Sequence, residues 1–391
     1  MNRISRVCLA ALVAALLVVP APVAASPAAP VPLLAYYYIW FDTRSWTRAK
    51  DDYPQLGRYS SDDPAVMARH VELAKRAGID GFIVSWKSTP TLNRRLDQLS
   101  RIASANRFKL ALIYEGLDFH RNPLPVEQVR RDFAEAADRY TRAPAFQLFD
   151  RPVVIWSGTW RFSRGDVARV VQPVRDRLLV LASEKDPEGV KRLAGLVDGD
   201  AYYWSSADPL RTPGYREKLA AMEQTVHGQG GRWIAPAAPG FDARKVGGTK
   251  VVERRDGATL VASLAAARAS SPDAVGLISW NEFSESSYVE PSRRYGRRSL
   301  DVLASVARPP TPEAAPETTA APAPKTDPTA APRTSPEAAT AADPAIDFAS
   351  DEPAGRDDGP GRLLLLGSLL LAGLGSLGVL VWRASRGRTR T

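Results

Sequence analysis

The feature that most constrains this chain is a repeated alternation of short apolar runs and amphipathic helical patterns. Apolar runs that favour β-strands occupy residues 33–39, 81–86, 110–114, 152–156, 178–182, 200–204, 232–236 and 274–280. Helical patterns occupy residues 63–78, 94–105, 126–140, 167–177, 189–196, 215–227 and 260–269. Strand–helix units repeated in this way predict an α/β fold with a parallel sheet, and eight strands predict a (β/α)8 TIM barrel.

A doubly wound open sheet is the competing fold for the same alternation. Its nucleotide-binding members carry Gly-x-Gly-x-x-Gly after the first strand or a Gly-x4-Gly-Lys-Ser/Thr loop. The first motif does not follow the first apolar run, and the second does not occur. We therefore expect the barrel over residues 30–308, a usual length for this architecture.

The N-terminal segment has a pattern of a different kind. Residues 1–25 consist of a basic start, a short apolar run and a small-residue site, which predicts a secretory signal peptide. Cys8, the only cysteine of the sequence, lies inside this segment. The mature chain would then have no disulfide and no thiolate metal site, so a large apolar core has to stabilise it.

The C-terminal segment predicts a stalk and a membrane anchor. Residues 309–361 are rich in Pro, Ala, Thr and Glu and nearly free of aromatic residues, which predicts a disordered linker. The uncharged run from Leu363 to Trp382 is long enough for one transmembrane helix. The basic tail, residues 383–391, is expected in the cytoplasm by the positive-inside rule. These patterns predict a single-pass protein of the cell membrane whose globular domain is extracellular and monomeric.

The formal net charge of +9 does not by itself indicate nucleic-acid binding. The predicted signal peptide and cytoplasmic tail contribute six arginines and no acid to this charge. We therefore expect no nucleic-acid partner. The remaining excess favours an acidic envelope polymer or is an ordinary solvated surface, and the sequence leaves both interpretations open.

Active sites of such barrels lie at the carboxyl ends of the strands. Aromatic faces there suit the C–H faces of sugar rings, and paired carboxylates are the acid–base groups of glycoside cleavage. These positions therefore indicate an oligosaccharide or polysaccharide substrate, unless the aromatic residues only cap the core and the acids are solvated. The residues expected there are Tyr38, Trp40, Phe41, Asp42, Trp86, Lys87, Tyr114, Glu115, Asp118, His120, Trp156, Trp160, Glu184, Lys185, Trp204, Phe241, Asp242, Trp280, Asn281, Glu282, Glu285 and Glu290.

No metal and no cofactor are expected. The three histidines are spread along the chain: His70 is expected on an apolar helix face and His227 at a helix end. Only His120 follows a strand, where it would bind a sugar or cap its loop. A serine nucleophile is not supported, because the Gly-x-Ser-x-Gly elbow is missing.

The segment after the last apolar run carries the strongest chemical signal. Glu282 and Glu285 are three residues apart. In a continuing strand they would point to opposite faces, whereas a turn after Trp280 would bring both carboxylates to one side. A separation of about 5–5.5 Å would then predict retention of configuration, and about 6.5–9.5 Å inversion. Glu290 would either contact the sugar or shape the loop.

The same segment resembles the N-E-W-x-E and E-P signature of glycoside hydrolase family 99, the endo-α-mannosidases and endo-α-mannanases. Here it reads W-N-E-F-S-E at residues 280–285 and Y-V-E-P at residues 288–291. Weaker similarities follow the family along the whole barrel: Y-Y-Y-I-W-F at residues 36–41, G-I-D-G-F-I-V-S-W at 78–86, Y-E at 114–115, R-P-V at 151–153 and P-A-A-P-G-F-D at 236–242.

The resemblance implies a retaining, endo-acting α-glycosidase that needs no metal. It implies that Glu282 is the base that activates the sugar 2-hydroxyl, which gives a 1,2-anhydro sugar, and that Glu285 is the acid/base. Tyr38, Glu115 and Tyr203 would line the sugar subsite, beside Trp40, Trp86, His120, Trp280, Asn281 and Glu290.

The chain also departs from the family pattern. Phe283 and Ser284 replace a usual tryptophan and a common histidine, Gly116 replaces a proline, and Lys87 replaces a second tryptophan. Both key glutamates remain, so the departures concern the substrate more than the chemistry. The alternative hypothesis is a catalytically inactive barrel that binds or organises cell-wall polysaccharide.

Overall fold

The computed structural model describes residues 30–47, 49–118 and 120–307. The predicted signal peptide, linker, membrane helix and basic tail lie outside these residues. Within the described ranges, none of the helices combines the length and the apolar character that crossing a membrane requires.

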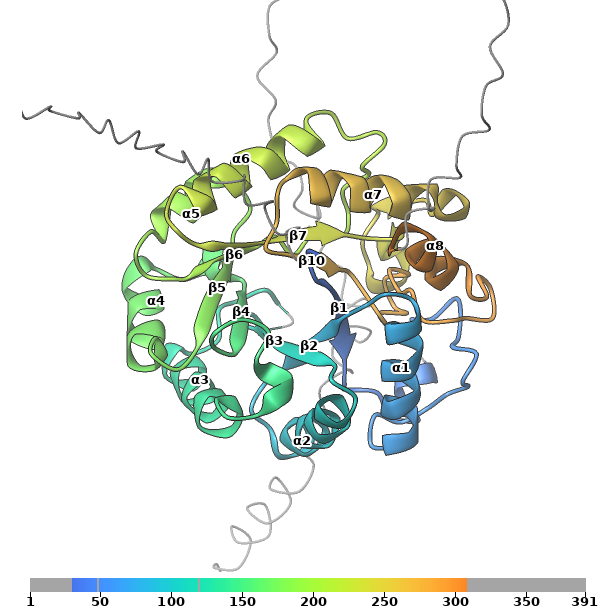
Figure 1. Cartoon of the computed structure of the whole chain (residues 1–391), viewed down its shortest axis with the longest axis horizontal. Coiled ribbons are helices and arrows are strands. Elements are labelled where there is room, and N and C mark those ends of the chain that lie inside the picture. Colours follow the sequence, from blue (N-terminus) through green and yellow to red (C-terminus); the bar gives the residue numbers. More distant parts are fainter. Residues whose placement is uncertain (1–29, 48, 119, 308–391) are drawn as a thin grey trace, which may run out of the picture. The chain divides into compact units, whose positions relative to one another are not determined.

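Eight parallel strands close into a barrel, which confirms the predicted (β/α)8 architecture (Figure 1). Around the barrel β10 follows β7 and pairs with β1, so the first and last strands are neighbours. The strands are β1 (Leu33–Tyr38), β2 (Gly81–Trp86), β3 (Lys109–Glu115), β4 (Val153–Ser157), β5 (Leu179–Ser183), β6 (Gly199–Ala201), β7 (Arg232–Ala237) and β10 (Ala274–Leu277).

Helices cover the outside of the barrel (Figure 1). They are α1 (Pro64–Arg76), α2 (Pro90–Ala105), α3 (Val126–Tyr140), α4 (Arg164–Val171), α5 (Pro187–Arg192), α6 (Tyr215–His227), α7 (Ala258–Ala269) and α8 (Arg298–Ala307). The predicted ends of α1 reflect real caps: the Asp63 side chain accepts the Ala65 N–H at 2.8 Å, and Pro64 occupies the first helical position. Helix α8 was not predicted, and neither was the small antiparallel pair β8 (Phe241–Asp242) and β9 (Val251–Val252).

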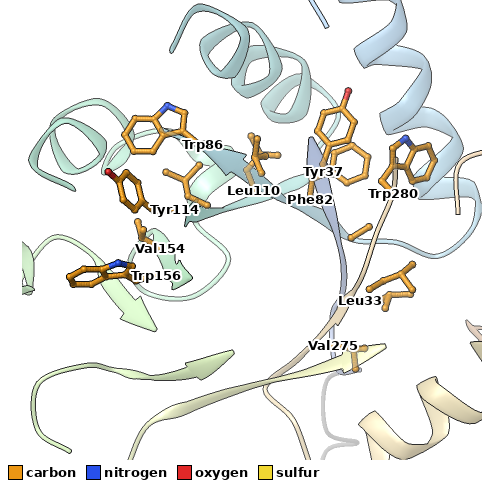
Figure 2. Close-up of a cluster of buried hydrophobic side chains, with 14 of the residues drawn as sticks. Leu33, Tyr37, Phe82, Trp86, Leu110, Tyr114, Val154, Trp156, Val275 and Trp280 are labelled. Atoms are coloured by element: carbon orange, nitrogen blue, oxygen red, sulfur yellow. The ribbon is translucent and has the colours of Figure 1, made fainter. Parts of the chain in front are cut away.

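Side chains of the strands alternate between the barrel interior and the layer beneath the helices. The interior is filled by residues such as Leu34, Tyr36, Ile83 and Ile113. The opposite faces pack against the helices and include Tyr37, Phe82, Trp86, Tyr114 and Trp156 (Figure 2). This alternation also decides which residues at the carboxyl ends can face a substrate in the barrel opening.

Candidate functional site

Three glutamates gather at the carboxyl end of the barrel, and we call them the carboxylate cluster: Glu115, Glu282 and Glu285. Glu115 is the last residue of β3, and its side chain accepts a long hydrogen bond of 3.5 Å from Ser85 Oγ at the end of β2. Glu282 and Glu285 lie in the loop that follows β10. The negative charges of Glu282 and Glu115 both act on Glu285, so the three groups share one electrostatic environment.

The loop after β10 is a closed turn. Strand β10 ends at Leu277, before the predicted end at residue 280, because Ser279 exchanges hydrogen bonds with Ser287 and Val289 of its own loop. The Glu282 N–H donates to Ser279 Oγ at 2.8 Å, and the Glu282 carboxylate accepts the Ser284 N–H at 2.9 Å. The turn that would bring the carboxylates of Glu282 and Glu285 to one side is therefore present.

Asn281 ties this loop to the first strand. Its side-chain Oδ1 accepts the Tyr38 N–H at 2.9 Å, and its Nδ2 donates to the Tyr38 carbonyl at 3.0 Å. The amide thus extends the pairing of β1 in the way that another strand would. Because Asn281 is fully buried and binds the backbone in this way, it holds the position of Glu282 and Tyr38, and its predicted contact with a substrate stays a prediction.

Burial and mutual repulsion affect the pKa values of Glu282 and Glu285 differently. Burial raises the pKa of Glu285 to about 8, and the charges of Glu282 and Glu115 add to this rise. Burial also raises the pKa of Glu282, but the Lys50 ammonium and the Ser284 N–H oppose the rise. Glu282 is therefore the group that ionises first, and Glu285 keeps its proton at neutral pH. Two carboxyl groups whose pKa values differ in this way can act as a base and an acid.

Aromatic hydroxyl groups complete the inner wall of the site. The Tyr38 and Tyr203 hydroxyls are hydrogen-bonded to each other, and both lie near Glu115 and Glu285. The Trp40 ring is partly exposed and its centroid lies 4.4 Å from that of Tyr38. The structure thus brings Tyr38, Trp40 and Tyr203 together with the carboxylate cluster, as the sequence analysis expected.

Other predicted sugar contacts lie in the core. Trp86 and Trp280 are at most 1 % exposed, and they pack in the layer beneath the helices (Figure 2). The Trp86 Nε1 donates to Asn93 of α2, and the Trp280 ring contacts Phe82 and His70. Their prediction as substrate contacts is not supported by this placement, because strand alternation turns Trp86 outward.

Glu290 is fully buried and belongs to a hydrogen-bonded network, not to the carboxylate cluster. Tyr59 Oη donates to its carboxylate at 2.8 Å, and His70 Nε2 donates to it at 3.0 Å. Tyr37 Oη donates to the other ring nitrogen of His70 at 3.0 Å, and Asn281 Nδ2 donates to Tyr59 Oη at 3.3 Å. The network joins α1 to the loop after β10, so Glu290 shapes the loop, which was one of the two roles left open.

His120 is exposed on the loop after β3. Its backbone N–H donates to the Asp118 carboxylate at 2.9 Å, and no side-chain hydrogen bond of His120 is present among the described residues. The Asp118 side chain therefore caps this loop, and His120 contributes only its backbone N–H.

The departures from the family pattern have physical causes here. A Cβ on Gly116 would lie 2.4 Å from the Trp156 Nε1, so the position accepts no side chain. Phe283 is buried and stacks on Tyr288 with ring centroids 4.0 Å apart. Ser284 Oγ accepts a hydrogen bond of 2.6 Å from Lys50 Nζ, which brings that cation beside Glu282.

A cavity of about 350 Å³ lies elsewhere, at the amino ends of β4 to β7. Arginine side chains and glycines line much of it, including Arg151, Arg232, Gly199 and Gly231. Because barrel active sites lie at the opposite ends of the strands, we do not connect this cavity with the carboxylate cluster. Across the described ranges, His, Cys, Asp and Glu side chains form no group of three suited to hold a metal ion.

Comparison with known proteins groups this sequence with the glycosyl hydrolases. Residues 56–302 match the family model described as Glycosyl hydrolase family 71. No curated protein matches the sequence.

Solved structures share the fold. A GH99 endo-alpha-mannosidase from Bacteroides thetaiotaomicron, in complex with Bis-Tris-propane, superposes with a TM-score of 0.61 and 18 % identity over 70 % of this chain and 94 % of that one. A second structure of this Bacteroides enzyme gives a TM-score of 0.61 at 17 % identity, over 70 % and 95 % of the two chains. A glycoside hydrolase-like protein gives 0.55 at 17 % identity, over 71 % and 93 %. At such identities the likeness concerns the fold alone.

Proposed function

The chain belongs to glycosyl hydrolase family 71, and we propose that it is a retaining, endo-acting α-glycosidase that cleaves α-mannan or a related glycan. The sequence resemblance pointed to family 99, whereas the matching family model is that of family 71. The mannan preference therefore rests on the strand-end signature and on the fold shared with the endo-alpha-mannosidase. The observation that carries the catalytic proposal is the closed turn after β10, which holds Glu282 and Glu285 together near Glu115, with Lys50 beside Glu282 alone.

Glu285 is proposed as the general acid and Glu282 as the base. A general acid must hold its proton at the working pH, and the pKa of Glu285, raised to about 8 by burial and by its acidic neighbours, meets that requirement. Lys50 and the Ser284 N–H favour the ionised form of Glu282, which a base requires.

The proposed reaction has two balanced steps. In the first, Glu282 takes the proton of the sugar 2-hydroxyl, O2 forms a bond to the anomeric carbon, and the glycosidic C–O bond breaks as Glu285 protonates the leaving oxygen. In the second, water attacks the anomeric carbon of the 1,2-anhydro sugar and the bond between this carbon and O2 breaks. Ionised Glu285 takes a proton from that water, and Glu282 returns its proton to the departing O2. Two inversions at one carbon give overall retention.

Tyr38, Trp40 and Tyr203 are proposed to hold the reacting sugar. The partly exposed Trp40 ring offers an apolar face to the C–H side of a sugar, and the two tyrosine hydroxyls offer hydrogen bonds to its hydroxyl groups. Glu115 is proposed as a further partner of the sugar hydroxyl groups. Burial raises the pKa of Glu115, and the nearby Lys87 charge opposes this rise.

The test is cleavage of α-mannan oligosaccharides by the full-length protein and its variants. Glu282→Gln and Glu285→Gln should each lower kcat by at least about 10²-fold, the usual contribution of acid–base catalysis. The exposed Glu217→Gln on α6 is the matched control and should leave kcat unchanged. Nuclear magnetic resonance of the first product formed should show the retained anomer.

A substrate analogue tests the route through the 2-hydroxyl. An oligosaccharide methylated at O2 of the reacting sugar should bind and resist cleavage, and rapid cleavage of it would rule out the anhydro step. Release of no oligosaccharide from any mannan, with binding preserved, would instead support the alternative, an inactive barrel that organises polysaccharide.

For the location, we propose a single-pass cell-membrane protein with an extracellular, monomeric domain. The support is the apolar run from Leu363 to Trp382, the basic tail after it and the signal-peptide pattern at the start. Protease treatment of intact cells should remove the barrel and leave the tail protected.

A further inference from the structure

Four side chains beside the carboxylate cluster form what we call the indole–cation patch: Arg121, Trp160, Lys185 and Trp204. They follow β3, β4, β5 and β6, which are consecutive strands around the barrel, so they lie along one continuous side of its carboxyl end. The Trp160 ring is at the centre of the patch. Lys185 Nζ lies 5.3 Å and Arg121 Cζ 5.9 Å from its centroid, and the Trp204 ring lies 5.2 Å away.

The two cations of the patch form no ion pair among the residues that the structure describes. Glu115 and Glu285 act on Arg121 only through longer-range charge. The acids of the same loops are engaged elsewhere. Asp118 accepts backbone N–H groups at 2.8 and 2.9 Å, Asp186 accepts the Gly189 N–H at 2.8 Å as the cap of α5, and Glu184 pairs with Arg192 at 3.0 Å.

The loop backbone holds Arg121 in place. Its φ of 62° is left-handed, and its N–H donates to the Asp118 carbonyl at 3.1 Å. A hydrogen bond of 2.9 Å from the Leu124 N–H to the Gly116 carbonyl closes the same loop at its base. The indole face attracts both cations by cation–π interaction, although the cations repel each other. An anion bound next to them would remove that repulsion.

The Arg121 side of the patch lies within electrostatic range of the proposed catalytic site. Burial raises the pKa of Glu115 and of Glu285, and the Arg121 charge is among those that oppose both rises. Arg121 therefore lies within electrostatic range of the carboxylate cluster and of the Trp160 ring at once. A glycan that occupies the cluster would extend over the patch with its neighbouring sugar.

We propose that the indole–cation patch is a subsite for an anionic sugar, one that bears a carboxylate or a phosphate, in the chain next to the sugar that is cleaved. The inference rests on the proposed glycosidase function and adds a substrate class to it. A guanidinium binds carboxylate and phosphate through paired hydrogen bonds, and an ammonium adds a second charge. The three acids of the cluster would repel an anionic sugar, so its charge fits only the subsite beside them.

Binding to a non-cleaving protein tests this proposal. The full-length Glu285→Gln variant is titrated with neutral α-mannan and α-glucan oligosaccharides, with the same oligosaccharides oxidised at C6 to uronates, and with their C6 phosphates. The anionic forms should bind about tenfold more tightly at low salt, since two partly exposed charge pairs each add a modest gain in affinity. Added salt should reduce this preference by screening.

Charge-removing variants locate the effect. Arg121→Gln with Lys185→Gln should abolish the preference for anionic oligosaccharides and leave the affinity for neutral ones within about twofold. The matched control is Arg101→Gln with Arg268→Gln, which removes two exposed charges near the C-terminal ends of α2 and α7. Because crossover helices run back toward the amino ends of the strands, these arginines lie at the other end of the barrel. Arg121→Lys, the conservative variant, should keep part of the preference if the double variant does not fold.

Each outcome separates the subsite from the function. Equal affinity for neutral and anionic oligosaccharides, with cleavage by the wild type intact, would overturn the subsite and leave the glycosidase. A preference that survives in the Arg121 and Lys185 variants would assign it to other residues and also overturn the proposal. If no oligosaccharide of either charge is bound or cleaved, both proposals fail together. Preference for the uronate alone or the phosphate alone identifies which anion the patch accepts.

Discussion

At the scale of single residues, the chemistry depends on how two glutamates three positions apart come to differ. Glu282 is buried and Glu285 is partly exposed, and only Glu282 has a nearby ammonium and an N–H donor to its carboxylate. Glu285 instead has two acidic neighbours. Part of the difference arises from Lys50, which reaches the loop from a segment 234 residues earlier. No local sequence pattern near Glu282 contains this information.

Replacement of Lys50 by glutamine should shift the acidic limb of the pH–activity profile. Without the ammonium, the ionised form of Glu282 is less favoured, so its pKa rises further and a higher pH is needed to produce the base. The midpoint of the acidic limb in the pH profile of kcat/KM should therefore shift to a pH about 0.5–1 unit higher. Lys191→Gln on α5, an exposed lysine, is the control and should not move it. An unchanged limb would show that Lys50 does not set the ionisation of the base.

At the scale of secondary-structure elements, the network around Glu290 attaches α1 to the loop that carries the cluster. His70 and Glu290 are both fully buried, whereas Arg69 and Glu72 form an exposed pair on the same helix. The two pairs therefore have different expected energies. A buried pair that loses one partner leaves a polar group unsatisfied, and an exposed pair leaves its partner in water.

His70→Leu should destabilise the folded protein by about 1–3 kcal/mol, because the buried Glu290 side chain loses a hydrogen-bond donor. Arg69→Ala, one residue earlier on α1, should change the free energy of unfolding by less than about 1 kcal/mol. Urea unfolding of both variants measures the contrast. Equal effects of the two substitutions would mean that the buried network contributes no special stability.

Much at this scale was predictable from the sequence. The eight strands and seven of the helices were found because their apolar periodicity reflects burial that the barrel requires. Counting alternate residues from the interior positions of β2 would also have turned Trp86 outward. The place of Trp280 was not accessible in this way, since it follows the end of β10 and depends on the fold of its loop.

The role of the buried polar residues was the least predictable. The sequence places His70 on an apolar helix face and Glu290 beside a proline, but their hydrogen bond joins residues 220 positions apart. Similarly, Asn281 was expected at a substrate, and the sequence does not show that it binds the backbone of Tyr38. Long-range pairs of this kind appear only when the barrel closes.

At the scale of the whole molecule, the cluster opposes the stability of the fold. An acid with a raised pKa keeps its proton in the folded state at pH values where the unfolded chain has already lost it. Unfolding then releases protons, and stability falls as the pH rises. For Glu285 the window extends from the ordinary value of 4.5 to about 8.

Glu285→Gln should therefore stabilise the protein at pH 8 by about 1–2 kcal/mol relative to wild type, although it lowers kcat. At pH 4.5 the two proteins should differ little, because the wild-type carboxyl is protonated in the folded state and still half protonated in the unfolded chain. Thermal unfolding at pH 4.5, 6 and 8 measures this dependence, with Glu217→Gln as the exposed control. A variant less stable than wild type at pH 8 would contradict the raised pKa.

The amide of Asn281 has a consequence for the biosynthesis of the protein. It binds a backbone residue 243 positions earlier, and it does so from a loop that follows the last strand to be synthesised. A nascent chain that has made β1 through β7 thus holds Tyr38 and Glu115 but has no partner to arrange them into a site. The proposed catalytic site can therefore form only in one late step, when the final strand joins the first, and a partly made chain is expected to lack hydrolytic activity.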